Sequence, residues 1–313
     1  MAMMDWIRTA SEEYLISLCE RTYKENGSIG GLEEGNRVVK LSDEIAVKFG
    51  YLVTAGEAAT QEFAYQHVDR SIVRVPRVYR HIIEKSNHPM KMGYLFLEYI
   101  PGQTLEALDL NTAEHRDIIP RIAKIVAHFG EISGGQVPGP LAGSRPQGYL
   151  WGDYGAQTSF QSIDDLNAWL NRRLTLRKLS IDLNPYPLVL CHMDLCRRNM
   201  ILDSTGSICL IDWGFSGLYP RFYEFATISC LNPYDEPYEN PLLQAVEQVM
   251  SLTEEEKRLV DLLHQARGLS LRYRFKDNSE EPRPPPVIDW AKVPVPPGVP
   301  PLTGIPPPPK ECS

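Results

Sequence analysis

The sequence has no long hydrophobic run and no excess of positive charge. No apolar stretch approaches the length of a membrane-spanning helix, about eighteen residues, and the first residues lack the form of a signal peptide. Lys and Arg total 32 against 40 Asp and Glu, which gives a net charge of −8. Such a balance disfavours an obligate nucleic-acid partner or an anionic membrane surface. We therefore expect no nucleic acid, no membrane and a cytoplasmic location.

Cysteine is sparse and scattered, with six residues at positions 19, 191, 196, 209, 230 and 312. The Cys-x-x-Cys and His-x-x-x-His spacings of zinc sites are missing, so we expect reduced, mostly packed thiols. The chain also lacks Gly-x-Ser-x-Gly, which disfavours Ser/His/Asp hydrolysis. With 313 residues, 43% of them hydrophobic, it is long enough for two separate cores.

Glycines are present between Ser28 and Gly35, but they do not match Gly-x-Gly-x-x-Gly. The segment either covers nucleotide phosphates or is only a flexible turn, and a glycine cluster alone does not decide between the two.

The sequence does contain a group of polar residues around a predicted hairpin, within residues 190–214. Asp194 and Asn199 follow a short apolar run, and Asp212 follows residues 200–211, in which two apolar runs are joined by an Asp/Ser/Gly turn. A hairpin folds the chain back, so we expect Asp212 to lie close to the other two. Oxygen ligands of this kind suit Mg²⁺, which leaves its remaining positions to water and phosphates.

The spacing His192-x-Asp194-x-x-x-x-Asn199, followed by Asp212-x-Gly214, resembles the catalytic and metal-binding loops of the protein-kinase-like superfamily. Asp-Trp-Gly in place of Asp-Phe-Gly is similar to the aminoglycoside phosphotransferase and choline kinase branch, and the residues that follow resemble fungal APH-domain proteins. The resemblance implies an α+β, bilobal, protein-kinase-like fold, whose small lobe is an antiparallel sheet plus a helix and whose large lobe is mainly α-helical. It implies an ATP-dependent kinase that phosphorylates a hydroxyl of a small molecule, with ATP and Mg²⁺ as cofactors.

The same resemblance assigns roles to individual residues. Asp194 is the expected base, which orients the acceptor hydroxyl and accepts its proton. Asn199 and Asp212 are expected to hold Mg²⁺ against the phosphates. Lys48, in the run Ile-Ala-Val-Lys, is expected to pair with the α- and β-phosphates, and Glu57 to hold it in place.

Further positions follow from the resemblance or qualify it. Glu57 fits the branch better than Glu62, which we expect only to solvate a helix face. The segment 97–102 resembles the hinge between lobes, where the C=O of Glu98 and the N–H of Ile100 would read the edge of adenine. His192 is expected to pack and to hydrogen-bond the loop rather than to react.

Departures from the kinase pattern shape the alternatives. Cys196 stands where protein kinases usually carry Lys, and no Ala-Pro-Glu motif follows, so a protein kinase is disfavoured. Arg197 and Arg198 either neutralise transferred phosphate or pair with acids, and at least one should be structural. Glu224 should hold structure or orient the neighbouring loop rather than react. A non-catalytic, kinase-like nucleotide-binding protein is the main alternative function, and a protein kinase is less favoured still.

Local patterns predict the elements around these residues. Helices are expected over 9–25, 56–68, 112–132, 164–178, 220–230, 241–250 and 254–274. Strand hairpins are expected over 37–41 with 44–49, and over 75–84 with 92–100. Capping patterns place Thr9, Ser162 and Thr253 at helix starts, and Pro120 predicts a kink or a boundary within its helix.

Three regions result: a nucleotide-binding lobe over 1–100, a catalytic and substrate lobe over 101–280, and a tail over 281–313. We expect the acceptor to be selected by the second lobe, around 134–180. Thirteen of the 26 prolines lie in the tail, which we expect to be extended and largely disordered. Its Pro-x-x-Pro spacing would suit an SH3/WW-like groove, but an untethered tail is the preferred interpretation.

Overall fold

The computed structural model describes residues 5–31, 35–85, 91–110, 112–231, 235–275 and 310–311. The helices are α1 (Asp5–Thr9), α2 (Glu12–Asn26), α3 (Ala55–His67), α4 (Ile118–Phe129), α5 (Ile163–Leu174), α6 (Phe222–Ile228), α7 (Glu236–Met250) and α8 (Glu254–Arg272). The strands are β1 (Gly30–Gly31), β2 (Arg37–Lys40), β3 (Ile45–Gly50), β4 (Val78–Ile83), β5 (Gly93–Glu98), β6 (Gly102–Thr104), β7 (Leu188–Cys191), β8 (Met200–Asp203), β9 (Ile208–Leu210), β10 (Gly217–Pro220), β11 (Tyr273–Arg274) and β12 (Lys310–Glu311). Short 3₁₀ turns are η1 (Leu105–Ala107), η2 (Leu141–Gly143), η3 (Tyr149–Trp151), η4 (Thr175–Arg177) and η5 (Arg197–Asn199).

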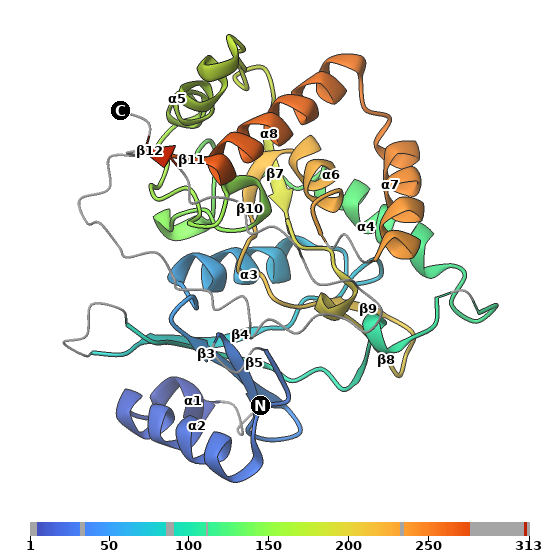
Figure 1. Cartoon of the computed structure of the whole chain (residues 1–313). Helices are drawn as coiled ribbons and strands as arrows, with labels where there is room; N and C mark the ends of the chain where they lie inside the picture. The colour runs from blue at the N-terminus through green and yellow to red at the C-terminus, as the bar shows by residue number, and fades with distance from the viewer. Residues whose placement is uncertain are drawn as a thin grey trace.

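The small lobe is an antiparallel sheet with strand order β1-β2-β3-β5-β4. Helices α1 and α2 cover one face, and α3 lies on the other, between the sheet and the large lobe (Figure 1). Strand β3 is buried along its whole length because both faces of the sheet are covered. This is the sheet-plus-helix lobe that the sequence predicts.

Helix α1 was not expected, and it changes how α2 begins. Because Thr9 ends α1, it cannot cap α2. Ser11 caps α2 instead, and its hydroxyl accepts the N–H of Tyr14 at 3.2 Å. The predicted start over 9–12 was therefore wrong by a few residues, although Gly27 ends the helix as expected.

The large lobe is mainly helical and has its own apolar core. In α4 the predicted stripe is buried, with Ile118, Ile122 and Phe129 each at most 1% exposed. The helix begins at Ile118, not at 112. Pro120 therefore lies in its first turn, where its missing N–H costs no hydrogen bond, and the boundary alternative is confirmed.

A strand pair that the sequence did not predict supports the centre of this lobe. β10 pairs antiparallel with β7, so the chain is extended up to Pro220 and α6 begins only at Phe222. A Cβ on Gly217 would lie 2.6 Å from the backbone of Gly139, so this close approach requires glycine. The expected helix start at Pro220 was wrong because pairing with a distant strand overrides the local proline signal.

The hairpin formed by β8 and β9 is joined to the small lobe next to residues 97–102, the segment predicted to be the hinge. β6, directly after the hinge, pairs with β8. The N–H of Arg74 donates to the C=O of Ile208 at 2.9 Å, and its guanidinium bonds Asp203 at 2.6 Å and Glu98 at 3.0 Å. These contacts fix the hairpin relative to the strand that leads into the hinge.

Two remaining expectations concern the C-terminal part. α7 begins at Glu236, earlier than the predicted 241, and keeps Pro241 inside it, whereas the capping box of Thr253 with Glu256 at the start of α8 is confirmed. In the tail, residues 310–311 form β12, parallel to β11, and the other residues of 281–313 lie outside the described part. Within the described residues, no helix is both long and apolar enough to span a bilayer.

The cap of α5 gives a test of the fold. The hydroxyl of Ser162 accepts the N–H of Asp165, whose carboxylate accepts the N–H of Ser162 in return. Ser162→Ala should lower the free energy of unfolding in urea by about 1 kcal/mol. Ser180→Ala, at an exposed position, should change it by less than about 0.5 kcal/mol, and equal losses in the two variants would contradict the capping role.

Candidate active site

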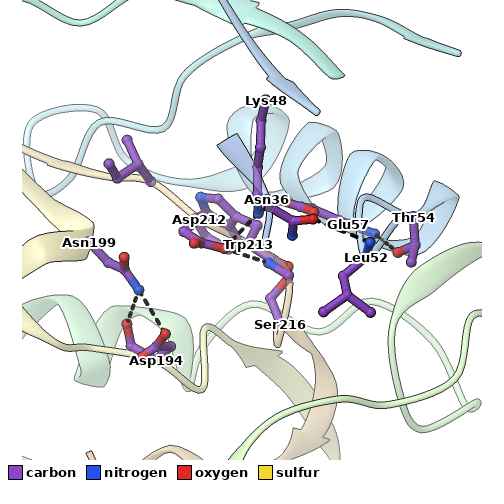
Figure 2. Close-up of polar contacts among 12 residues, drawn as sticks. Asn36, Lys48, Leu52, Thr54, Glu57, Asp194, Asn199, Asp212, Trp213 and Ser216 are labelled. Atoms are coloured by element: carbon purple, nitrogen blue, oxygen red, sulfur yellow. Dashed lines mark hydrogen bonds and ion pairs between the residues drawn. The ribbon is translucent and has the colours of Figure 1, made fainter. Parts of the chain in front are cut away.

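The loop that follows β7 carries Asp194, whose side chain is buried in the large lobe. The amide nitrogen of Asn199 donates to Asp194 Oδ2 at 2.8 Å and to its backbone C=O at 3.1 Å. Figure 2 shows both bonds, with the Asn199 nitrogen turned towards Asp194 and its oxygen turned away. The five-residue spacing read from the sequence thus brings the two side chains together.

Glu224, in the first turn of α6, supports the backbone of this loop. Its carboxylate accepts the N–H of His192 at 2.5 Å and the N–H of Met193 at 2.9 Å. Met193 has a φ of +69°, a left-handed conformation that few side chains adopt without such support. Burial raises the pKa of Glu224 to about 7, although the two N–H donors act in the opposite direction. The expectation that Glu224 orients the loop is confirmed.

His192 is a packing residue, as expected. Its ring is fully buried, with Nε2 3.1 Å from the C=O of Ile211, and Nδ1 accepts the N–H of Asp194 at 3.3 Å. Burial lowers its pKa, so the ring is neutral, and the two contacts assign the proton to Nε2. His192 therefore links the loop to the end of the hairpin and has no free nitrogen for chemistry.

The hairpin returns Asp212 beside Asn199. The N–H of Ile211 donates to the C=O of Asn199 at 2.9 Å, which fixes the next residue, Asp212, next to the loop that carries Asp194. Asp212 has a φ of +60°. Trp213 is fully buried, where its ring packs against His192 and its Nε1 donates to the C=O of Leu210 at 3.1 Å. The anchored tryptophan holds Asp212 in its unusual conformation.

Lys48 of β3 connects the two halves of the site. Its ammonium bonds Glu57 Oε1 at 2.5 Å and Asp212 Oδ1 at 2.8 Å. Burial opposes the charged form of Lys48, but the carboxylates of Asp212 and Glu57 outweigh it and raise its pKa. For Asp212, burial is likewise outweighed by the Lys48 ammonium, which lowers the pKa of the carboxyl. Glu62 instead accepts a bond from Gln66, so the preference for Glu57 agrees with the geometry.

Asn199 and Asp212 fit a magnesium ion better than a fully protein-enclosed metal. The side chain of Asp212 is 47% exposed, and the orientation of the Asn199 amide leaves its oxygen away from Asp194. Among the residues that the structure describes, no three His, Cys, Asp or Glu side chains group as a metal site. One carboxylate oxygen and one amide oxygen are enough protein ligands for Mg²⁺, which takes its other ligands from water and phosphates.

The predicted hinge contacts concern backbone groups. The N–H of Glu98 donates to the C=O of Arg77, and the N–H of Tyr99 donates to the C=O of Glu44, both at 2.9 Å. The side chain of Glu98 bonds Arg74, so it does not face a ligand. Adenine recognition through the Glu98 C=O and the Ile100 N–H stays a prediction.

The glycine-containing segment before β2 forms part of the sheet edge. Gly30 and Gly31 make up β1 and pair with Val38 and Arg37, while residues 32–34 lie outside the described part. Asn36, at the end of this segment, accepts the N–H of Leu52 at 3.3 Å (Figure 2). Both interpretations of the segment, a cover over nucleotide phosphates and a flexible turn, stay predictions.

The two arginines after Cys196 separate into different roles. Arg197 makes a forked pair with Asp235, at 2.8 and 2.9 Å, and is structural. Arg198 faces Asp194 Oδ2 at 3.4 Å and is half exposed. Cys196 is buried, and none of the five described cysteines forms a disulfide. The expectation that at least one arginine is structural is confirmed.

Sequence reasoning missed Tyr149. This residue opens η3, within the 134–180 region that we expect to select the acceptor, and its hydroxyl donates to Asp194 Oδ1 at 3.1 Å. Tyr149 is 45 residues from Asp194 in the chain, and no motif joins them. The only local signal is the pair of flanking glycines, Gly148 and Gly152, which suggests a constrained turn.

The buried lysine gives a stability test. Lys48→Met leaves Glu57 in the interior without its cation, and we expect a loss of about 3–5 kcal/mol in the free energy of unfolding. Adding Glu57→Leu removes the uncompensated charge and should recover most of the loss, since Asp212 can be hydrated. Chemical denaturation of the single and double variants measures this, and a double variant no more stable than the single would contradict the explanation.

The shifted pKa of Glu224 gives a pH test. The native state keeps this proton up to about pH 7, whereas the ordinary value is 4.5, so the native state binds more protons between these values. The stability that this carboxyl contributes is complete below the ordinary pKa and is lost as the pH rises to about 7. Relative to Glu224→Gln, the wild-type free energy of unfolding should fall by at most about 1.4 kcal/mol per pH unit in that window. Parallel pH curves for the two proteins would contradict a buried, shifted carboxyl.

Comparisons of sequence and of structure relate the chain to known proteins. No curated protein matches the sequence. Among similar solved structures, the aminoglycoside phosphotransferase APH(4)-Ia is 15% identical, with a TM-score of 0.48, over 82% of this chain and 89% of that one. The spectinomycin phosphotransferase APH(9)-Ia, in complex with ADP and spectinomycin, is 15% identical, with a TM-score of 0.46, over 77% of this chain and 78% of that one.

The family model of the APH phosphotransferase enzymes matches residues 33–261. The match includes Lys48, Glu57 and the whole stretch from Asp194 to Asp212, which are the residues that carried the resemblance in the sequence. The chain belongs to the APH phosphotransferase enzyme family.

Proposed function

We propose that the protein is a Mg²⁺- and ATP-dependent O-phosphotransferase that phosphorylates a hydroxyl of a small molecule. The observation that carries the proposal is the convergence of two sets of side chains. The buried pair of Asp194 with Asn199 lies at one side of the site, and Lys48, with its carboxylate partners Glu57 and Asp212, lies at the other (Figure 2). Phosphoryl transfer requires mainly positioning and charge neutralisation, which these two sets are suited to supply.

Asp194 would act on the acceptor. Its carboxylate would orient the acceptor hydroxyl and take its proton as the hydroxyl oxygen bonds to the γ-phosphorus of ATP, whose bond to the departing ADP oxygen breaks. The amide of Asn199 fixes the carboxylate plane, and Glu224 fixes the backbone from which it projects. The base is therefore held on both its side-chain and its main-chain atoms, which favours a fixed angle of attack.

Lys48 would act on the nucleotide. Its ammonium is held by Glu57 at a buried position and is suited to neutralise oxygens of the α- and β-phosphates. Asn199 and Asp212 would hold Mg²⁺, which supplies charge neutralisation at the phosphates when bound. The C=O of Glu98 and the N–H of Ile100 would bind the adenine edge at the hinge.

The regional assignment follows from these roles. Residues 1–100 would form the nucleotide-binding lobe and 101–280 the catalytic and substrate lobe, with 281–313 as an appended tail. The acceptor would approach from the large lobe, where the part of the 134–180 region that contains Tyr149 reaches Asp194. We propose a hydroxylated small molecule as the acceptor class and do not extend the antibiotics of the similar structures to this chain.

The proposed base is tested by Asp194→Asn. Loss of the carboxylate should lower the rate of phosphoryl transfer by about a hundredfold to ten-thousandfold, because the acceptor proton loses its base. Nucleotide affinity, measured by calorimetry with Mg²⁺-ATP, should change little. The rate is measured against a panel of amino alcohols, sugars and aminoglycosides.

Asp153→Asn serves as the control, since Asp153 is an exposed carboxylate on a loop of the same lobe and should leave both quantities unchanged. Absence of nucleotide binding by the wild-type protein would exclude the proposal. Nucleotide binding without transfer to any acceptor or to water would favour the non-catalytic alternative.

A further inference from the structure

Tyr149 lies where a substrate hydroxyl is expected in the proposed reaction. Its Oη is 3.1 Å from Asp194 Oδ1, within the distance at which a base removes a proton. We propose that Tyr149 is a positioning residue, which fixes the Asp194 carboxylate and marks the place beside it where the acceptor hydroxyl docks. This inference rests on the proposed function, and it adds a residue of the acceptor side that the family motif does not contain.

The tyrosine is held from several directions. The residues after it, Leu150 and Trp151, are buried at 3% and 2% exposure, and they anchor the turn in the large-lobe core. Its ring meets Phe215 edge-on with centroids 5.6 Å apart, and its C=O accepts from Arg267 Nε at 3.1 Å. These contacts leave the hydroxyl directed at Asp194 without a need for ligand.

The two flanking glycines permit this turn. Gly148 has a φ of +106°, and a Cβ there would lie 2.7 Å from the Phe215 ring. Gly152 has a φ of +81°, and a Cβ there would lie 3.0 Å from the side chain of Ser270. Because both ends of the segment are packed against neighbours, the side chain of Tyr149 is held in one position beside Asp194.

The two carboxylate oxygens of Asp194 accept hydrogen bonds from different donors. Oδ2 accepts from Asn199 at 2.8 Å and also faces Arg198 at 3.4 Å. Oδ1 accepts from the hydroxyl of Tyr149, and the buried thiol of Cys196 also bonds the carboxylate. An acceptor hydroxyl that gives its proton to this base therefore approaches Oδ1, next to the tyrosine, rather than Oδ2.

The charges around Tyr149 keep it as a donor. Burial and then the Asp194 carboxylate raise the pKa of the phenol, while the Arg198 guanidinium, 3.5 Å from Oη, acts in the opposite direction. The phenol is therefore neutral, and its proton points to the base. A neutral donor that shares Oδ1 with the acceptor holds the carboxylate in place without taking up the proton that is released.

The first test needs no turnover. In protein labelled with [¹³Cζ]tyrosine, the resonance of Tyr149 is identified by its loss in Tyr149→Phe. We expect it to move in Asp194→Asn, because the phenol loses a carboxylate partner, and to stay unchanged in Asp153→Asn. An unchanged Tyr149 resonance in Asp194→Asn overturns the inference even if the protein proves to be a phosphotransferase.

The second test measures kinetics with the acceptor that the screen identifies. Tyr149→Phe removes only the hydroxyl and should lower kcat by about tenfold to a hundredfold. The KM for Mg²⁺-ATP should change by less than about threefold, because Tyr149 does not lie on the nucleotide side.

Tyr154→Phe is the matched control, since Tyr154 lies on the same loop but pairs with Arg274 instead of Asp194. It should change neither kcat nor the KM for Mg²⁺-ATP. An unchanged kcat in Tyr149→Phe overturns the positioning role.

One chemical alternative has its own readout. If Tyr149 were itself the acceptor, its oxygen would bond to the γ-phosphorus as ADP leaves and Asp194 takes the phenolic proton. Mass spectrometry of the full chain after incubation with Mg²⁺-ATP would then show one added phosphate on the peptide that contains residue 149. That result overturns the positioning role, and an unmodified peptide supports it. A wild-type chain that binds ATP and transfers to nothing rejects the proposed function, whereas the resonance shift still decides whether Tyr149 and Asp194 are coupled.

Discussion

The structure depends on one buried cation. Lys48 lies in the interior of the small lobe, and an ammonium at such a position is stable only when carboxylates neutralise it. One carboxylate comes from α3 and the other from the end of the β8–β9 hairpin of the large lobe. Pairing this charge therefore brings the sheet, the helix and the hairpin to one point. The bonds from Arg74 to Asp203 and Glu98 then hold the β8–β9 hairpin against the small lobe.

A second constraint acts on the large-lobe side of the candidate site, where Met193 and Asp212 are among the residues with left-handed backbone conformations. Met193 and Asp212 both have positive φ, and a neighbouring side chain stabilises each of them. Glu224 accepts two consecutive N–H groups at the first, and the buried ring of Trp213 anchors the second. Met193 directly precedes Asp194, and Asp212 is itself a candidate site residue, so this backbone strain lies where geometry matters more than local stability.

Much of the site could be predicted from the sequence because its parts are close together in the chain. Asp194, Asn199 and Asp212 lie around one hairpin, and turn residues between two apolar runs are sufficient to predict their convergence. Lys48 with Glu57 required a known family pattern, because the strand and helix that carry them have no distinctive composition. Helix caps at Ser162 and Thr253 were correct since they depend on three or four neighbouring residues.

The parts that could not be predicted all depend on contacts between distant segments. β10 is a strand because β7 is beside it, and α2 begins at Glu12, capped by Ser11, because α1 occupies the residues before it. Tyr149 reaches Asp194 because Trp151 is buried in a core assembled from several helices. None of these has a local signature. The sequence by itself determined which side chains are available and how the β8–β9 hairpin folds, because short spacings and turn chemistry act locally. Only the tertiary structure decided which side chain faces Asp194, because that contact depends on packing between segments that sequence order does not bring together.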